Sequence, residues 1–482
     1  MQGRKQYQEK LFISFRLSDR VPENNFYRRL NNSLDLNFLY KSTSKYYGKE
    51  GTPGLDPVVF FKLILTGYFH NLQSDRSIIE NARLRMDILF FIGYNIDEEL
   101  PWHSTISRTR QLLGEEVFQE LFQKVLIQCI DKGMIAGKRQ AIDSVLIKAN
   151  AAMDSLQTLK ILEDGANYVT NLSCEEDEDD EPKPVQRQGK NNSRHQSTTD
   201  PDARIATKPG KPRQMNYLGQ VSVDTGHHVI TNMEVHFADK RDSQCFEQAL
   251  LHTIENLGQG SIKIEEAIAD TNYSSIEALK AAEKQHVTAY IPNVGQYKKE
   301  RVGFKYFAEG DYYQCEQGTI LPFKKLRISR GRNLMKDYIA LTKDCKECAL
   351  KTSCIGKKNY KTLSHSSEKE LYDQMNERMK TSYARKLRKL RQSTVEPVIG
   401  TLVNFMAMKK IRTKGIVQAN KYAIGAAIAY NLKKMLKWPP QKPKTVAIAM
   451  SFPIKIKLPE PLSILFQQIN LYKLNYQPVW TL

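Results

Sequence analysis

Hydrophobic residues recur at three- and four-residue spacing through much of the first 138 residues. The segments PVVFFKLILTGYFHNL and GEEVFQELFQKVLIQCIDKG follow this spacing, which is typical of amphipathic helices. Pro53-Gly54 and Asp56-Pro57 mark turns between helices. The run PWHST predicts a helix start, with Ser104 or Thr105 as the N-cap. We therefore expect a helical N-terminal domain over residues 1–138.

The pattern changes at Arg139, where β-branched residues begin to alternate with polar ones. The segments QAIDSVLIKANA and NYLGQVSVDTGHHVITNMEVHF are typical of strands. The segments IKIEEAIAD, SSIEALKAAEKQ and VTAYIP then follow in strand–helix–strand order. That order predicts an α/β sheet, in which functional residues gather at the carboxyl ends of strands. We expect this α/β domain to extend over residues 139–438.

Two segments interrupt the predicted α/β domain. Residues 174–213 contain an acidic run at 175–181 and then mostly Pro, Gln, Ser, Asn and Lys, which predicts a disordered loop. Residues 293–369 form a basic insert that carries cysteines. A helical region follows from Glu370 to Trp438, and residues 439–482 form a Pro-containing tail.

The charge balance narrows the choice of partner. The 482 residues include 72 Lys and Arg against 53 Asp and Glu, a net charge of +19. Such an excess favours nucleic acid first and an anionic membrane surface second. The most apolar early run, residues 58–69, contains Lys62 and is too short to span a bilayer. Without a secretion signal, and with an odd number of cysteines, seven, the chain is expected in a reducing cytoplasm.

Three acidic residues stand in different local contexts: Asp143 in QAIDSVLIKA, Asp270 at the end of EEAIAD, and Glu396 in RQSTVEPVIG. Two carboxylates on apolar strands and a third on a helix suit a pair of divalent cations. Structural alternatives exist: Asp143 could cap a turn, Asp270 could form an Asx-turn or N-cap, and Ser393-x-x-Glu396 matches a capping box. An uncompensated carboxylate inside an apolar strand is costly, so Asp143 is the hardest to explain structurally.

Basic residues are concentrated in two places. Seven Lys or Arg and no acid lie between Arg378 and Arg391, and on a helix they would suit a phosphate backbone. The candidate DNA contacts there are Arg385, Arg388 and Arg391. In the segment ISRTRQLL, Arg108 and Arg110 suit a DNA reader of helix-turn-helix type. For both segments the alternative is an amphipathic helix with a solvated basic face.

The chain resembles the DDE transposases of bacterial insertion sequences, specifically the family of insertion sequence 1182, from about residue 10 to residue 437. The resemblance rests on YYGKEGTPGLDPVVFFKLILTGYFHNLQSDRSI and PWHSTISRTR in the helical part, and on AIDSVLIKANA, YLGQVSVDTGHHVIT, AIADTNYSS, TVEPVIG and AIAYNLKKML after it. It implies an RNase H-like fold, a mixed sheet flanked by helices. In that fold Asp143, Asp270 and Glu396 would bind two Mg²⁺ or Mn²⁺ ions.

The resemblance also implies a reaction in which water and then a DNA 3′-hydroxyl attack phosphorus in line. The related group often places a Tyr and an Arg before the Glu and a Lys seven residues after it. Arg391 fills the Arg role here, whereas Arg388 stands near the Tyr position and Val403 at the Lys position. This departure leaves Lys409 and Lys410 as candidates for holding the phosphates of the transposon ends.

A cysteine cluster lies in the basic insert. Cys345-x2-Cys348-x5-Cys354 resembles half of a tetrahedral zinc site, with Cys315 upstream or His365 downstream as the fourth ligand. A structural zinc would hold together a lobe with little core of its own. Free thiols are the alternative.

These observations predict a transposase that binds the terminal inverted repeats of its element in double-stranded DNA, cuts them and joins them to target DNA. Pairing two ends implies a homodimer on DNA, and the resemblance implies a bacterial cytoplasm, at the nucleoid. Two alternatives remain: a metal-dependent nuclease that does not join strands, and a non-catalytic DNA-binding protein derived from a transposase.

Overall fold

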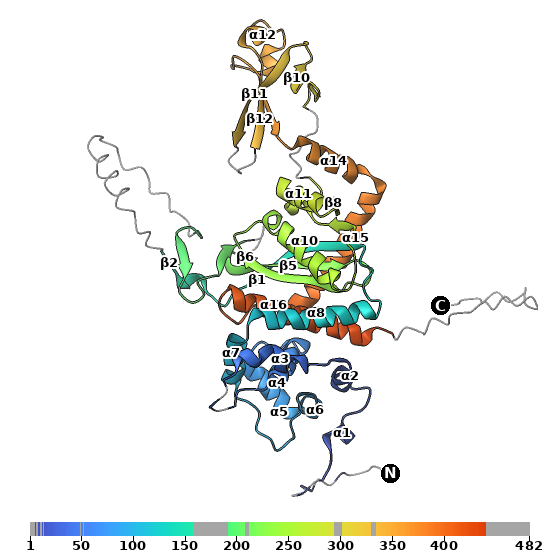
Figure 1. Ribbon diagram of the computed structural model, residues 1–482. Helices are drawn as coiled ribbons and strands as arrows, with labels where there is room; N and C mark the ends of the chain where they lie inside the picture. Colours follow the sequence, from blue (N-terminus) through green and yellow to red (C-terminus); the bar gives the residue numbers. More distant parts are fainter. Residues whose placement is uncertain are drawn as a thin grey trace, which may run out of the picture. The chain divides into compact units, whose positions relative to one another are not determined.

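The computed structural model describes residues 14–48, 53–158, 191–207, 212–293, 301–328 and 334–439, together with residues 5, 8, 9, 12, 50 and 51. Residues 1–438 form one compact unit. Within its described part, an N-terminal group of helices is followed by a mixed sheet and a second, smaller sheet (Figure 1).

Side-chain caps fix the starts of two of the N-terminal helices. Asp56 accepts hydrogen bonds from the amides of Val58 and Val59 at the start of α4, and Pro57 occupies the first helical position. Ser74 and Ser77 form a reciprocal capping box at the start of α5. The helices are α1 (Leu17–Arg20), α2 (Phe26–Ser33), α3 (Phe38–Thr43), α4 (Pro57–Phe69), α5 (Asp75–Leu84), α6 (Met86–Ile92), α7 (His103–Leu112) and α8 (Glu115–Asp131).

The start of α7 differs from the prediction. The helix begins at His103, and its N-cap position is Trp102, which makes no side-chain capping bond. Ser104 and Thr105 therefore lie inside the first turn. Ser104 and Thr105 indicated the right region, but the N-cap is Trp102, two residues before Ser104.

The larger sheet contains six strands in the order β4-β5-β1-β7-β8, with β6 also paired to β5. The pairs β1–β5 and β5–β6 are antiparallel, whereas β1–β7 and β7–β8 are parallel. The strands are β1 (Arg139–Lys148), β4 (Arg204–Ala206), β5 (Gln214–Asp224), β6 (Ile230–Phe237), β7 (Glu266–Ile268) and β8 (Thr288–Tyr290). The structure is thus of mixed α/β class, as predicted.

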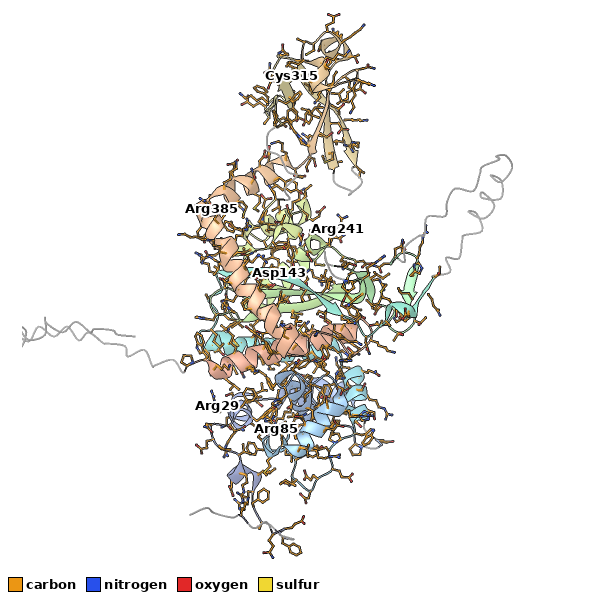
Figure 2. All side chains as sticks on the ribbon, turned by 180° about the vertical axis from the view of Figure 1, so that it is seen from behind. Arg29, Arg85, Asp143, Arg241, Cys315 and Arg385 are labelled. Carbon is orange, nitrogen blue, oxygen red and sulfur yellow. The ribbon has the colours of Figure 1, made fainter. Side chains whose placement is uncertain are left out.

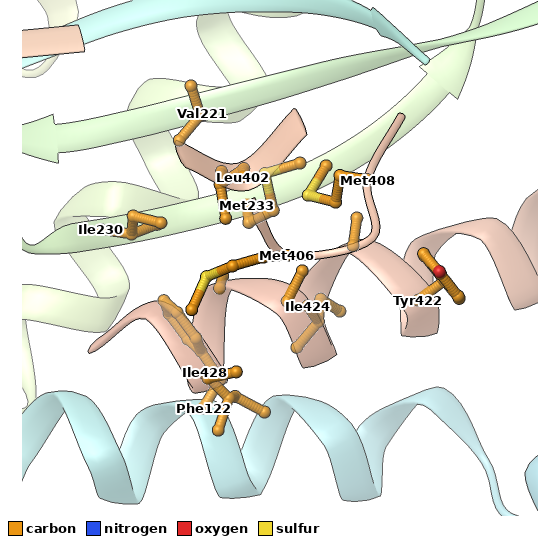
Figure 3. Packing of buried hydrophobic residues seen from close by; sticks show 14 of the residues in the cluster. Phe122, Val221, Ile230, Met233, Leu402, Met406, Met408, Tyr422, Ile424 and Ile428 are labelled. Carbon is orange, nitrogen blue, oxygen red and sulfur yellow. The ribbon is translucent and has the colours of Figure 1, made fainter. Parts of the chain in front are cut away.

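Helices cover both faces of this sheet. Leu218 of β5 packs with Ala238 and Cys245 on the side of α10 (Asp242–Gly258). Figure 3 shows the other side, where Ile424 and Ile428 of α16 lie between the strands and Phe122 of α8. The remaining helices of the domain are α11 (Ile276–Lys284), α14 (Lys369–Lys380), α15 (Ser382–Phe405) and α16 (Ile416–Lys437).

The N-terminal helices and the sheet share one continuous core through α16. Lys421 of α16 is 2% exposed, and its ammonium donates to the carbonyls of Arg110 and Leu113 at the end of α7. Gly425 of α16 lies directly against Tyr68 of α4, where a Cβ would be 2.7 Å from the tyrosine ring. These contacts join the predicted domains 1–138 and 139–438 over a packed interface.

Part of the predicted disordered loop is ordered. In residues 191–207, β3 (His195–Ser197) pairs with β2 (Leu156–Thr158), and β4 pairs with β5. The buried Asp200 accepts hydrogen bonds from the Tyr217 hydroxyl at 2.8 Å and from the Gly415 amide at 3.0 Å. These long-range bonds order a segment whose composition predicted disorder. The acidic run at 175–181 and the tail from residue 440 lie outside the described residues.

The cysteine-bearing insert contains a separate antiparallel sheet in the order β13-β12-β11-β10-β9. Its small core consists of Tyr313, Leu321, Tyr338, Ala340 and Leu363. The strands are β9 (Phe304–Phe307), β10 (Tyr312–Cys315), β11 (Ile320–Ile328), β12 (Leu334–Ile339) and β13 (Thr362–Ser366), with the short helices α12 (Thr342–Lys346) and α13 (Lys351–Cys354). None of the helices in the described residues is both long and apolar enough to cross a membrane.

Candidate functional site

Asp143 lies in the middle of β1, on the face of the sheet covered by α15. One carboxylate oxygen accepts the Ser144 amide at 2.8 Å, and the other accepts the Arg391 guanidinium at 2.6 Å. Burial raises the pKa of Asp143, and the charge of Asp270 adds to this rise, whereas Arg391 and the Ser144 amide oppose it. Asp143 is thus a half-buried acid whose negative charge is only partly compensated.

Asp270 follows β7 and lies close to Asp143. Residues 139–141 of β1 pair in parallel with residues 266–268 of β7, so continuing the register brings Asp270 level with Asp143. Asp270 accepts the Asn272 amide at 2.8 Å and caps the short 3-10 helix Thr271–Tyr273. The capping role considered from the sequence is therefore present. It leaves the second carboxylate oxygen of Asp270 with a single long bond, 3.3 Å, from the side chain of Asn272.

Glu396 occupies a different face from the two aspartates. It lies in the interior of α15, which begins at Ser382 with Thr381 as its cap, so the capping-box interpretation of Ser393 and Glu396 is wrong. Arg391 is buried on the side of α15 that faces the sheet, whereas Glu396 is exposed. At 100° per residue these two side chains point about 140° apart. The structure brings Asp143 and Asp270 together and leaves Glu396 outside this pair.

The pair of aspartates has the donor chemistry of a divalent-cation site. Carboxylate oxygens are the ligands preferred by Mg²⁺, and two neighbouring acids with incomplete charge compensation fit a cation between them. Within the described residues, no three His, Cys, Asp or Glu side chains are gathered closely enough to hold a metal ion. Two of the three predicted ligands therefore fit a cation in this conformation, and the third would have to approach.

The predicted arginines divide into exposed and buried groups. Figure 2 shows Asp143 on the sheet and Arg385 on α15. Arg385 and Arg388 are exposed, as are their neighbours Lys386 and Lys389. Arg391 is 9% exposed and bonded to Asp143, so we do not count it among the DNA contacts. On the helix, Arg385, Lys389, Gln392 and Glu396 are spaced to form one exposed stripe, which we call the α15 stripe.

The two arginines of α7 also differ. Arg108 is exposed, whereas Arg110 is 8% exposed and donates two hydrogen bonds to Asp75, at 2.9 and 2.6 Å. The α7 helix turns its Arg110 side into the packed interior because Ile106 and Thr109 on that side are buried. Arg110 therefore cannot contact a phosphate in this conformation, and Arg108 remains a candidate.

A second basic cluster lies beside the end of β1. Lys410 pairs in parallel with Lys148, and the Ile411 amide donates to the Lys148 carbonyl at 2.9 Å. Burial lowers the pKa of Lys410, and the charges of Arg412 and Lys148 lower it further. Lys409 and Lys410 were predicted, but Lys148, Arg412 and Lys414 were not. The run MKKIRTKG at 408–415 was the missed signal, since it has four cations and no acid.

The cysteine cluster is not assembled as a metal centre in the described residues. Cys315, Cys345, Cys348 and Cys354 are half-buried free thiols. His365 is unsuited as the fourth ligand, because its ring nitrogens lie 2.8 Å from the Tyr313 hydroxyl and 3.0 Å from the Tyr338 hydroxyl. Burial lowers the pKa of His365 to about 4. A structural zinc remains a prediction that would require Cys315 as the fourth ligand.

Comparison with known proteins adds two family matches. Residues 15–112 match a transposase domain (DUF772), and residues 314–436 match a transposase DDE domain. The chain is similar to DDE transposases. The second match includes Glu396, whereas Asp143 and Asp270 lie before it. The family of insertion sequence 1182 is not distinguished by these matches.

Solved structures with some similarity include the Mos1 transposase paired-end complex with left transposon end, at 11% identity and a TM-score of 0.17. The pre-cleavage Mos1 transpososome has 10% identity and a TM-score of 0.16. Each match covers 52% of this chain, and the chain spans 64% and 65%, respectively, of the Mos1 chains. No curated protein matches the chain.

Proposed function

We propose that this protein is a DDE transposase that binds the ends of its element and catalyses metal-dependent cleavage and strand transfer of DNA. The observation that carries the proposal is the pair Asp143 and Asp270 on adjacent parallel strands. The DDE transposase match, which includes Glu396, supports it. The strand order β6-β5-β1-β7-β8 supports an RNase H-like sheet, with three antiparallel strands and then two parallel ones. The finer assignment, to the family of insertion sequence 1182, rests on the sequence resemblance.

Asp143 and Asp270 would bind the divalent cations, Mg²⁺ or Mn²⁺. When bound, such ions lower the pKa of an attacking hydroxyl and stabilise the departing oxygen of a phosphodiester. The Ser144 amide holds one oxygen of Asp143, and Arg391 holds the other. These two bonds orient the carboxylate, and the guanidinium supplies a positive charge at the site in the absence of an ion.

Glu396 would be the third ligand after a local change in α15. Pro397 lies inside this helix and cannot donate the backbone hydrogen bond to Ser393, so the helix is weakened at the residue that must turn. We propose that DNA and cations draw Glu396 from the exposed α15 stripe towards Asp143. If Glu396→Gln retains full cleavage activity, Glu396 is not a ligand.

The exposed cations form the proposed DNA surface. Arg385 and Arg388 on α15, Arg108 on α7, and Lys409 and Lys410 after α15 are the predicted contacts that the structure leaves exposed or half-buried. Positive side chains of this kind contact phosphate and position a duplex without reading its sequence. Joining two element ends would require two copies of the chain on DNA. The proposed setting is the bacterial cytoplasm.

The decisive experiment uses DNA carrying the sequences that flank the gene, with Mg²⁺. The wild type should cut this DNA and join it to a target, and Asp270→Asn should reduce both by at least about 10³-fold while DNA binding persists. Asp131→Asn is the matched control, because Asp131 is an exposed acid at the end of α8.

The alternatives give different results. Cleavage without a joined product would favour a nuclease. Binding without turnover by the wild type would favour a non-catalytic DNA-binding protein. Turnover that survives Asp270→Asn would overturn the proposed metal site.

A further inference from the structure

A cavity of about 740 Å³ lies between α4, α5 and α7 on one side and the segment 412–418 with the start of α16 on the other. Its volume is typical of a site for a small ligand. It lies among the N-terminal helices and the 408–415 run, so it is distinct from the aspartate pair on β1 and β7. No residue predicted from the sequence to act in catalysis lines it.

The walls of the cavity are held in place by several hydrogen bonds. The Tyr68 hydroxyl donates to the Tyr422 carbonyl at 2.9 Å, and the two rings pack edge to face. On the other wall, Asn150 donates to the Arg412 carbonyl at 2.8 Å, and the Ile416 amide donates to Asp202 at 2.9 Å. The cavity is therefore preformed and would not need to be opened by its ligand.

Two residues of the lining each carry a buried polar atom that has no partner among the described residues: the hydroxyl of Thr413 and the side-chain carbonyl oxygen of Gln418. Burying a polar atom without a hydrogen bond costs about 1–3 kcal/mol. Both atoms lie on the same wall, within six residues of each other. Rotation of the two side chains would bring both atoms to a ligand in the cavity, and the hydrogen-bonding groups of that ligand would then satisfy them.

The charge around the cavity favours an anion. Arg412 and Lys414 line it and are exposed, and Lys148 and Lys410 lie next to Arg412. Asp75 is the only acid among the described lining residues, and its carboxylate is held by Arg110. The site therefore combines cations at its edge with hydrogen-bonding side chains and tyrosine rings inside.

We infer that this cavity binds one unpaired nucleotide of a DNA strand, with the phosphate at Arg412 and Lys414 and the base near Thr413 and Gln418. A stacked base in a duplex cannot enter a cavity, so the nucleotide must come from a single-stranded tail or be turned out of the helix. The inference rests on the proposed function, since it assumes that DNA is the ligand of this protein. It adds a site that recognises a strand end or a distorted duplex.

The test compares two labelled DNAs that share one duplex, one blunt and one with a short thymidine tail. Binding to the full-length protein is measured by fluorescence anisotropy without divalent metal, so that nothing is cut. Contacts between a base and aromatic or polar side chains contribute substantially to the binding free energy at single-strand sites. The tailed DNA should therefore bind about five- to tenfold more tightly than the blunt DNA. Thr413→Val and Gln418→Leu should each reduce this preference at least about threefold without changing affinity for blunt DNA.

Gln128→Leu is the matched control, because Gln128 on α8 also has a buried carbonyl oxygen without a partner among the described residues and lies outside the cavity. It should leave both affinities unchanged. Thr413→Val keeps the size of the side chain, and thermal unfolding of each variant verifies that the protein is folded.

The outcomes separate this inference from the proposed function. Equal binding of tailed and blunt DNA by the wild type would overturn the inference alone. Equal losses for both DNAs in the two cavity variants would also overturn it, because the cavity would then serve the duplex backbone. Tight, Thr413-dependent binding of thymidine monophosphate without a tail preference would assign the cavity to a free nucleotide. Failure to bind either DNA would overturn the proposed function, and this inference with it.

Discussion

Two arginine–carboxylate pairs in different regions of the molecule have similar burial and different surroundings. Arg110 and Asp75 join α7 to α5 in the N-terminal helices, with side chains 10% and 21% exposed. Arg391 and Asp143 join α15 to β1, with side chains 11% and 18% exposed. Both arginines were candidate DNA contacts on the sequence. Burial alone therefore does not distinguish a structural ion pair from one at a functional site.

The surroundings of the carboxylates make the difference. Asp75 receives two hydrogen bonds from one guanidinium and is the first residue of α5, where the helix dipole favours a negative charge. Asp143 receives one bond from Arg391, and burial and Asp270 raise its pKa. The charge of Asp75 is compensated by its arginine and by the helix, whereas Asp143 retains negative charge that a cation could bind. This contrast is what makes the second pair the candidate functional site.

The largest effect is expected from Arg110→Met. This change leaves the half-buried Asp75 without its partner, and breaking a largely buried pair in this way costs about 3–5 kcal/mol of the free energy of unfolding. Urea denaturation followed by circular dichroism would measure the loss. Adding Asp75→Asn to the variant should recover part of it. A loss below about 1 kcal/mol would show that the Arg110–Asp75 pair contributes no more to stability than the Arg391–Asp143 pair.

A change of the exposed α15 stripe should affect DNA binding instead of stability. Arg385→Gln combined with Lys389→Gln removes two proposed phosphate contacts, so the slope of log affinity against log salt should fall by nearly two. Affinity should fall about tenfold at moderate salt. Titrations of labelled DNA at several salt concentrations would measure both quantities. The matched control is Lys343→Gln with Lys346→Gln in α12, two exposed cations outside the stripe.

Arg391→Met should cost less stability than Arg110→Met, about 1–2 kcal/mol. Burial already raises the pKa of Asp143, so a proton can neutralise this carboxylate when the guanidinium is removed. Urea denaturation of the two arginine variants, under the same conditions, gives the comparison directly. Equal losses would mean that the Asp143 carboxylate depends on its arginine as fully as Asp75 does.

The smallest effect on stability is expected from Asp270→Asn. Removing this charge relieves its repulsion with Asp143, and the asparagine oxygen can still accept the Asn272 amide. The free energy of unfolding should stay the same or rise by up to about 1 kcal/mol. Mn²⁺ should raise the melting temperature of the wild type and not that of this variant. A clear loss of stability would indicate that Asp270 is needed mainly as a cap.

The strands, the main helices and the proximity of the aspartates could be predicted from the sequence. The resemblance to DDE transposases implied that Asp143 and Asp270 meet, and the parallel register of β1 and β7 brings them level. Which arginines face the sheet was not predicted, because the seven cations between Arg378 and Arg391 are alike until the register of α15 is fixed. That register was available in principle, since Leu387, Arg391, Thr394 and Val398 fall on one side at helical spacing.

Two other features depend on long-range contacts that composition does not record. Residues 191–207 are ordered partly by Asp200, which bonds with Tyr217 and Gly415. The capping-box alternative for Ser393 and Glu396 is wrong because Pro397, which is usual in a first helical turn, lies inside α15. In both cases a rule based on nearby residues alone predicted the wrong local structure.

The buried Lys421 has a consequence for the design of chimaeras between such proteins. Its ammonium holds two carbonyls at the end of α7 from within α16, more than 300 positions later in the chain. A helical region transplanted without its own α16 would lose that anchor and expose an apolar face. Chimaeras made at residue 138 should therefore aggregate, whereas exchanges that carry both segments together should yield folded protein with altered DNA preference.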